Sequence, residues 1–363
     1  MSDSDEYRGK ELEVVLRYPQ LRSDIVGTSL ELENMGITGN IPEYIDALYE
    51  FALVELKLGE NQLKGPIPAH LQFPNLEYLW LNENRTLSGP IPWKLGNLTN
   101  LRSLNLETNQ LTGLIPWQLG RLTQLEHLGL SNNKLWGPIP WQLGQLARLE
   151  HLDLANNKLG KDQHGNDIPT EQGGGTIPWQ LGVLSELVVL DLAHNQLTGH
   201  IPYQLRELSK LVELNLARNQ LTGRIPPGFK LLINLNDLNL DNNQLTGEFP
   251  FYKGDFPAIK PNKQTFWNNR IVLTRNNLQS PEHNKVWRRE DIDAQGKRPE
   301  RKSAPRRIMK SAHKGNTNAE GRRRKTNRRR KTNKRRKTNR RKKTNRRRKT
   351  NRRKKTNRRR KKN

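Results

Sequence analysis

The chain of 363 residues contains no cysteine, so no disulfide bond stabilises it, which agrees with a reducing compartment. No stretch approaches the ~18 consecutive apolar residues of a membrane-spanning helix. Residues 1–16 are acidic and lack the apolar segment of a secretory signal peptide. We therefore expect an intracellular protein of the nucleus, nucleolus or cytoplasm, and an extracellular one only if the N-terminus is incomplete.

Acidic residues are scarce at one end only. The formal net charge of +28 combines −10 over residues 1–250 with +38 over residues 251–363. Residues 321–363 contain 29 lysines and arginines, no acidic residue and no apolar residue. We expect this segment to be disordered by itself, because it cannot form a core. Such a charge split is typical of a folded domain with an interaction tail.

The abundant residue is leucine, and it is periodic. The phrase L-x-x-L-x-L-x-x-N-x-L-x-G-x-I-P returns mostly every 24 residues, for example as LVELNLARNQLTGRIP over residues 211–226. A weaker first copy begins near Gly27, and a 14-residue insertion lies within residues 160–176. The other copies begin at Leu53, Leu76, Leu101, Leu125, Leu149, Leu187, Leu211 and Leu235.

The repeat predicts a stack of about nine units rather than a globule. In each unit, L-x-L forms a short strand whose leucines point inward, and neighbouring strands pair into a parallel sheet. The asparagine after each strand supplies an amide that can satisfy backbone groups freed at the turn. Glycine then permits a tight bend, and proline blocks a long helix.

The phrase LxxLxLxxNxLxGxIPxxLGxLxx is similar to the leucine-rich repeat of plant receptor-like kinases, receptor-like proteins and polygalacturonase inhibitors. The resemblance covers residues 27–250. It implies an α/β leucine-rich-repeat solenoid, curved, with a parallel sheet on the concave side and short 3-10 or irregular segments on the convex side. It also implies that the concave face, and sometimes a lateral surface, binds proteins or peptides. The paired cysteines that usually cap extracellular members are missing here.

These patterns divide the chain into four parts. We expect residues 1–26 to form an N-terminal cap and residues 27–250 the solenoid. Residues 251–310 are expected to be a degenerate C-terminal cap or linker, and residues 311–363 a disordered basic tail. We expect a monomer.

The tail repeats K-T-N-[RK]-R-[RK] with a period of six from Gly321 onward. We expect it to bind RNA, DNA or another polyanion in a salt-dependent and sequence-independent way, or to direct the protein to the nucleus. An in-frame expansion of a short DNA repeat without a selected role would leave the same pattern. The candidate residues are Arg322, Arg323, Arg324, Lys325, Lys334, Arg335, Arg336 and Lys337.

The strand positions that face away from the core are polar and acidic. Tyr78 and Trp80 project from one strand, and amphipathic aromatics on a polar face are candidate hot spots for a partner. Packing against the N-terminal segment is an equally good interpretation of both. The other candidate partner-binding residues are Asn105, His127, His151, Asp153, Asp191, Glu213, Asn215 and Asp237. Two surface histidines without a third ligand rarely make a metal or acid–base site.

An aromatic residue follows the I-P of five repeats: Trp93, Trp117, Trp141, Trp179 and Tyr203. If the insertion loops out, these residues form one ladder along the solenoid. We favour a structural role, in which stacked rings shield the edge of the core, over a carbohydrate- or protein-binding stripe. The insertion is expected to be a flexible loop and a candidate contact surface, without the pattern of a calcium site.

No kinase, hydrolase or nucleotide-binding motif occurs, so we expect no enzymatic activity, cofactor or metal. The main hypothesis is a non-enzymatic recognition or scaffold module whose concave face binds a protein or peptide, with a tail for polyanion binding or nuclear targeting. One alternative is a nucleic-acid-associated protein that acts through the tail. Another is a receptor-like or secreted recognition protein whose signal peptide is missing from this sequence.

Overall fold

The computed structural model describes residues 7–16, 28–42, 45, 52–71, 73–169, 174–247, 270–273, 276–278 and 286–288. The predicted tail, residues 311–363, lies outside the described residues. Within the described ranges, no helix is long and apolar enough to cross a membrane.

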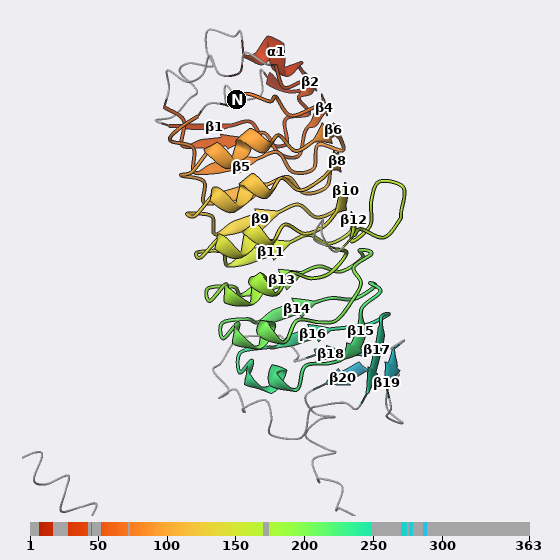
Figure 1. Ribbon diagram of the computed structural model, residues 1–363. Coiled ribbons are helices and arrows are strands. Elements are labelled where there is room, and N and C mark those ends of the chain that lie inside the picture. The colour runs from red at the N-terminus through yellow and green to blue at the C-terminus, as the bar shows by residue number, and fades with distance from the viewer. Residues whose placement is uncertain are drawn as a thin grey trace, which may run out of the picture. The chain divides into compact units, whose positions relative to one another are not determined.

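A long sheet on the concave side runs through all the repeats (Figure 1). Each L-x-L segment forms a three-residue strand, and successive strands pair in parallel and in register, with Leu128 opposite both Leu104 and Leu152. This is the parallel sheet that the repeat predicts. Its strands, in spatial order, are β1 (Ser29–Glu31), β3 (Glu55–Lys57), β5 (Tyr78–Trp80), β7 (Ser103–Asn105), β9 (His127–Gly129), β11 (His151–Asp153), β13 (Val189–Asp191), β14 (Glu213–Asn215), β16 (Asp237–Asn239), β18 (Arg270–Val272) and the antiparallel β20 (Val286–Arg288).

A second row of strands, which the sequence analysis did not predict, lies between the asparagine and the I-P of the repeats. Each ends near the glycine of the phrase, and Gly113, for example, has a φ of 83° that turns the chain toward the I-P. Six of these strands form one sheet and three form another. They are β2 (Thr38–Asn40), β4 (Gln62–Gly65), β6 (Thr86–Pro90), β8 (Gln110–Gly113), β10 (Lys134–Gly137), β12 (Lys158–Leu159), and then β15 (Thr222–Arg224), β17 (Gln244–Gly247) and β19 (Asn277–Leu278).

Short 3-10 helices follow the I-P segments on the convex side, as predicted. In η4 (Trp117–Arg121), Pro116 precedes the first turn in an extended conformation. The helix ends at Leu122, whose backbone N–H donates to the Leu119 carbonyl oxygen. Each helix lies against the helix of the next repeat. The others are η3 (Trp93–Asn97), η5 (Trp141–Gln145), η7 (Trp179–Val183), η8 (Tyr203–Glu207) and η9 (Pro227–Leu231).

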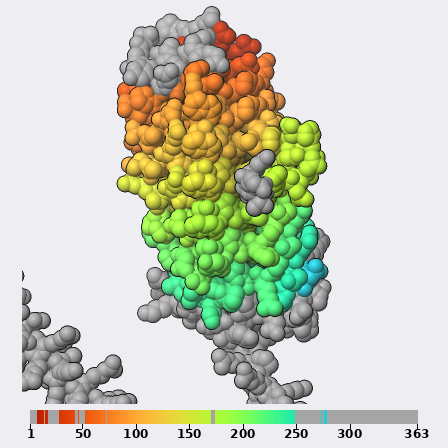
Figure 2. Space-filling model, in the orientation of Figure 1, coloured from red at the N-terminus to blue at the C-terminus, as the bar shows by residue number. Residues whose placement is uncertain are grey.

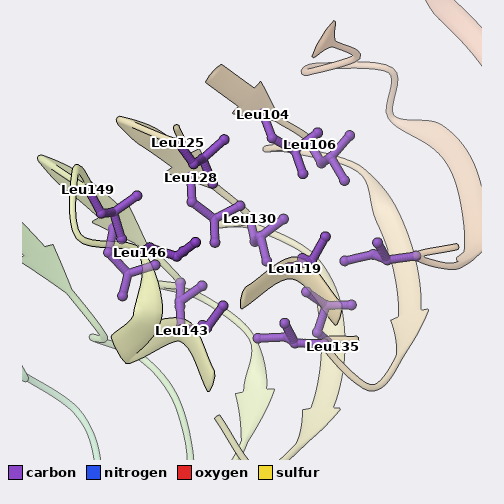
Figure 3. Close-up of a cluster of buried hydrophobic side chains, with 14 of the residues drawn as sticks. Leu104, Leu106, Leu119, Leu125, Leu128, Leu130, Leu135, Leu143, Leu146 and Leu149 are labelled. Carbon is purple, nitrogen blue, oxygen red and sulfur yellow. The ribbon is translucent and has the colours of Figure 1, made fainter. Parts of the chain in front are cut away.

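The leucines of the repeats form one continuous core. Figure 3 shows Leu104 and Leu128 from the long sheet beside Leu119 and Leu143 from the 3-10 helices, all within the same cluster. Each of these side chains is 0–1% exposed. Burying one leucine contributes roughly 1.5–3 kcal/mol, and a single repeat has no second layer to bury it against. The stack is therefore the smallest stable unit, as the period predicts.

The asparagine of each repeat ties neighbouring repeats together, which confirms the predicted structural role. In the fully described case of Asn133, Nδ2 donates to the carbonyl oxygen of Leu106 in the preceding repeat at 2.9 Å. Its Oδ1 accepts from the backbone N–H of Leu111 at 2.9 Å. These are backbone groups that the turn leaves without a partner, so the buried amide replaces the water that cannot reach them.

Atypical rungs close the two described ends of the stack. At the N-terminal end, helix α1 (Leu12–Val15) and Tyr7, which is 1% exposed, cover the first repeat, and Lys10 accepts a hydrogen bond from the Thr38 backbone at 2.8 Å. At the other end, the sheet continues beyond the expected boundary at residue 250. There Leu273 is buried, and Asn276 Nδ2 donates to the Leu240 carbonyl at 2.9 Å, as in the regular repeats.

The insertion leaves the stack undisturbed and projects from its side, coloured yellow-green in Figure 2. Gly160 and Gly175 meet where the insertion leaves and rejoins the repeat, because a Cβ on Gly175 would lie 2.3 Å from the Gly160 carbonyl oxygen. Between them, Lys161 pairs with Asp167, and Asp162 Oδ1 accepts from the backbone of Asn166 at 2.8 Å. Residues 170–173 lie outside the described part.

Candidate functional site

A hollow of about 570 Å³ lies on the concave face of the solenoid, in front of the middle strands of the long sheet. This volume falls within the ~300–1,000 Å³ that small-molecule and peptide-side-chain sites usually have. The hollow is lined by Glu33, Glu60, Trp80, Asn82, Ser103, Leu104, Asn105, Glu107, His127, Leu128, Gly129, His151, Asp153, Val189, Asp191 and Glu213. It therefore crosses several repeats, and its long axis follows the stack.

Two glycines on the concave face leave room for side chains that line the hollow. Gly129 occupies an outward-facing position of β9, and a Cβ there would lie 2.4 Å from Oε1 of Glu107. Gly59, in the turn after β3, would meet Oδ1 of Asn82 at 2.6 Å in the same way. Glu107 over Gly129 and Asn82 over Gly59 therefore occupy the space that a side chain at either glycine would take.

The carboxyl groups of the hollow are partly removed from water. Burial, together with the negative charges of Asp153 and Glu83, raises the pKa of Glu107 to about 7. Burial is likewise the largest cause of the raised pKa of Asp191 and of Glu213. The ionised forms of these groups therefore lack the solvation that water would give them.

Asp153 lies at the centre of this acidic group. Its charge contributes to the raised pKa of Glu107, Asp191 and Glu213 alike. Its Oδ1 accepts a hydrogen bond from the Ala155 backbone at 2.9 Å, which fixes the side chain.

Trp80 lines the hollow and is held by contacts within the concave face. Its Nε1 donates to Oγ of Ser103 at 3.0 Å. The Tyr78 ring stands edge-on to it, with ring centroids 6.5 Å apart, and the Lys57 ammonium lies 4.8 Å from its ring centroid. Lys57 itself is paired with Glu31 at 2.9 Å and Glu55 at 2.6 Å. Trp80 is thus a fixed, half-buried aromatic surface, the type of side chain that anchors many interfaces.

His127 and His151 are neighbours on adjacent strands, as expected, with ring centroids 4.7 Å apart and planes tilted by 35°. Burial lowers the pKa of His151, and the adjacent His127 lowers it further. Among the described residues, no group of three or more His, Cys, Asp or Glu side chains converges closely enough to hold a metal ion. The histidine pair is therefore a polar, stackable wall of the hollow.

The hollow contains seven of the ten residues that the sequence marked as partner-binding candidates: Trp80, Asn105, His127, His151, Asp153, Asp191 and Glu213. Tyr78, Asn215 and Asp237 adjoin it. Asn215 donates to Oδ2 of Asp191 at 2.9 Å, and the charge of Asp237 raises the pKa of Glu213. Their part in binding stays a prediction.

Sequence reasoning missed four lining residues in the turns that follow the strands: Glu33, Glu60, Asn82 and Glu107. The available signal was glycine at outward-facing positions. Where the repeat places Gly59 and Gly129, a long side chain from the neighbouring repeat can turn inward, and this brings turn residues into the site.

The chain is also similar to known proteins. Residues 100–122, 124–146, 186–208 and 210–232 match the family model described as Leucine Rich Repeat. The solenoid is a leucine-rich-repeat domain. No curated protein sequence matches the chain significantly.

The leucine-rich-repeat domain is similar to solved plant receptor ectodomains. One is the ectodomain of the membrane receptor kinase GASSHO1/SCHENGEN3 from Arabidopsis thaliana in complex with CASPARIAN STRIP INTEGRITY FACTOR 2, at 39% identity and a TM-score of 0.60, over 70% of this chain and 28% of that chain. Another is the structure of PEPR1–AtPEP1, at 34% identity and a TM-score of 0.62, over 74% of this chain and 34% of that chain. A third is the Arabidopsis receptor kinase HAESA in complex with the peptide hormone IDA and the co-receptor SERK1. Its identity is 35% and its TM-score 0.52, over 61% of this chain and 35% of that chain. The chain spans about a third of the length of these ectodomains.

The aromatic ladder lies on the convex side of the leucine-rich-repeat domain, one residue at the start of each of five 3-10 helices. The rings of Trp93, Trp117, Trp141, Trp179 and Tyr203 are 47–61% exposed. Among the described residues they make no ring–ring contact with one another, so the expected mutual stacking is absent. Instead, Arg121 lies over Trp117 at 5.0 Å and Arg206 over Tyr203 at 5.5 Å. The ladder is an exposed row, separate from the hollow.

The basic candidates fall outside the described residues. These are Arg322, Arg323, Arg324, Lys325, Lys334, Arg335, Arg336 and Lys337.

Proposed function

We propose that the leucine-rich-repeat domain recognises a peptide, or a peptide segment of a protein, in the hollow on its concave face. The hollow is the observation that carries this proposal. It extends across the strands from the turn after β1 to β14, so an extended chain can lie along it and contact several repeats. The likeness to the HAESA ectodomain, solved with a peptide hormone, supports the class of ligand.

Trp80 is the expected anchor of that ligand. Its contacts with Ser103, Tyr78 and Lys57 hold the ring in place before binding, so little side-chain entropy is lost when a ligand covers it. The histidine pair supplies a second flat surface with hydrogen-bonding edges. Between them, Glu107 lies over Gly129 and presents its carboxyl group to the ligand.

A random peptide library displayed on phage and selected on the full-length protein tests this proposal. Synthetic copies of the enriched peptides are then measured by titration calorimetry. We expect Trp80→Ala to weaken them by about tenfold or more, as for an interface hot spot. Gly129→Val suits a strand but places its side chain where Glu107 lies, so it displaces a lining carboxyl group, and we expect it to weaken binding as well.

Trp141→Ala is the matched control, because it removes an equally large ring from the convex side. It should leave affinity unchanged. If the selected peptides bind both hollow variants as well as the original protein, or lose affinity equally with Trp141→Ala, the proposed site is wrong.

A second candidate function concerns residues 321–363. Their composition of lysine, arginine, threonine, asparagine and glycine supports binding to polyanions, because each neutralised phosphate releases counterions. In an electrophoretic shift assay with duplex DNA and RNA, affinity should fall steeply with salt and be lost when residues 321–363 are deleted. Unchanged binding after the deletion would exclude this function for the tail.

Nuclear localisation is proposed on the same basis, from basic clusters such as Lys334–Lys337. A fluorescent fusion should move out of the nucleus when residues 321–363 are deleted. The alternative of a secreted recognition protein predicts instead an upstream exon that encodes a signal peptide.

A further inference from the structure

The hollow carries a strong excess of one charge. Six of its lining residues are acidic: Glu33, Glu60, Glu107, Asp153, Asp191 and Glu213. None of its lining residues is a lysine or an arginine. An electrostatic field of one sign, focused by the walls of a hollow, attracts ligands of the opposite sign.

The nearest described cations are already engaged. Lys57, beside Trp80, is bound between Glu31 and Glu55. Arg102 is paired with Glu77 at 2.9 Å and with Glu126 at 3.0 Å, and none of these three residues lines the hollow. Of the hollow carboxyl groups, Glu33 still feels the charge of Lys57, which acts to lower its pKa. No lysine or arginine acts in this way on the pKa of Glu107, Asp191 or Glu213.

The carboxylates are spread along the hollow rather than gathered at one point. The described residues hold no group that could bind a single metal ion, so one compact cation does not satisfy the site. An extended ligand with several cationic groups does, because each group can pair with a different repeat.

We infer that the ligand of the hollow is a cationic peptide segment, with arginine or lysine side chains directed at Asp153 and its neighbours Glu107 and Asp191. This inference rests on the proposed function and adds the chemical class of the ligand. Arginine fits best, because its planar guanidinium donates to two carboxylate oxygens at once and also stacks on aromatic rings such as Trp80.

Burial strengthens this selectivity. The carboxyl groups that water solvates poorly gain more from a cationic partner than exposed carboxylates do. A neutral ligand would bury them further without compensation, and an anionic one would add repulsion. Polyanions such as nucleic acids are therefore excluded from this face, whatever binds elsewhere on the chain.

Three octapeptides test the inference on the full-length protein. They alternate glycine with arginine, with citrulline or with glutamate; citrulline has the shape of arginine without its charge. By fluorescence anisotropy at low salt, we expect the arginine peptide to bind at least about tenfold more tightly than the citrulline peptide. The glutamate peptide should bind only through the basic residues 321–363, so its binding should be lost when these residues are deleted. Raising the salt concentration should weaken binding of the arginine peptide, since part of the hollow is open to solvent and its charges are screened.

Matched variants locate the effect. Asp153→Asn and Asp191→Asn keep the side-chain shape and the hydrogen bonds from the Ala155 and Ala193 backbone. Each substitution should lower the affinity for the arginine peptide about fivefold or more. Glu186→Gln removes the same charge away from the hollow, where it pairs with Lys210, and should have no effect. Equal affinity for the arginine and citrulline peptides, or an equal loss with Glu186→Gln, would overturn the inference.

The outcome separates this inference from the proposed function. If library peptides need Trp80 but are neutral, the hollow binds peptides and the cationic class is wrong. If they need neither Trp80 nor Gly129, the site itself is wrong.

Discussion

At the scale of single residues, the repeated asparagine does more than mark the turn, and one of its copies is incomplete. Asn157 donates to the Leu130 carbonyl at 3.0 Å and accepts from the Leu135 backbone at 3.0 Å. Asn109 makes the donor contacts, but its buried Oδ1 has no partner in the structure. The repeat before it has one additional residue, and the Leu87 N–H bonds to the Asn84 carbonyl instead.

This difference predicts unequal costs of the same substitution. Asn157→Ala leaves a buried N–H and buried carbonyl groups unpaired, and should destabilise the protein by about 3 kcal/mol. Asn109→Ala strands only carbonyl groups, so its cost should be smaller by about 1 kcal/mol. Urea unfolding followed by circular dichroism measures both. Equal losses would show that the accepted hydrogen bond contributes nothing.

Glu107 predicts a specific pH dependence of stability. Its folded pKa of about 7 lies above the ordinary value of 4.5 of the unfolded chain, so the folded state binds the proton more tightly. Between about pH 4.5 and 7 the unfolded chain loses this proton first, and the contribution of Glu107 to stability falls as pH rises. Glu107→Gln removes that slope.

Because the carboxyl group is partly exposed, we expect Glu107→Gln to stabilise the protein by only about 1 kcal/mol at pH 8, and not at pH 4. Thermal unfolding of both proteins across this range gives the difference, in which the other titrating groups cancel. A constant difference at every pH would contradict the shifted pKa of Glu107.

At the scale of the elements, each pair of neighbouring 3-10 helices packs through a glycine on one of the two helices. A Cβ on Gly120 would lie 2.5 Å from the carbonyl oxygen of Gln142 in the next helix. In η8 the equivalent residue is Arg206, and the residue that faces it in η9 is Gly228. In this pair the glycine therefore lies on the second helix rather than the first, and the two helices still approach closely.

Gly120→Ala should therefore cost about 1–3 kcal/mol, because the methyl group meets rigid backbone. Arg206→Ala is the control at the equivalent position and should cost less than about 0.5 kcal/mol. Denaturant midpoints compare the two. If Gly120→Ala is as mild as the control, the helices are free to separate and the contact does not limit the packing.

The sequence predicted the elements that obey the period and missed those that depend on departures from it. The leucine strands and the asparagine contacts recur through the described units, and the 3-10 helices recur in six of them, so one rule describes them all. The second row of strands was missed because it forms only between repeats, through backbone hydrogen bonds that leave no side-chain pattern. The β18 rung was missed because the Leu273–Asn276 phrase follows a long non-repetitive stretch. Half of the acidic residues that line the hollow were missed, because they lie in turns. Gly59 and Gly129 leave the space in which side chains from such turns reach the hollow.

At the scale of the whole domain, stability is approximately the sum of contributions from single repeats and from contacts between neighbouring repeats. The contacts between the two repeats that flank the insertion illustrate this. The hydrogen bonds that cross it join residues outside it. Asn195 donates to the Leu154 carbonyl at 2.9 Å, and Gln196 donates through its backbone to the Leu159 carbonyl at 2.8 Å. The helices η5 and η7 on either side remain in contact.

Deleting residues 161–174, which joins Gly160 to Gly175, should therefore leave the solenoid folded. The two glycines already touch, and shortening a loop lowers its closure entropy, so we expect stability to change by no more than about 1 kcal/mol. Library peptides that depend on Trp80 should bind the deletion variant unchanged, because no residue of the insertion lines the hollow. A variant in which a glycine–serine segment of equal length replaces residues 161–174 separates loss of sequence from loss of length. If both variants lose peptide affinity while circular dichroism shows an intact fold, the insertion is a contact surface for the ligand, and the binding site extends beyond the concave face to the side of the stack.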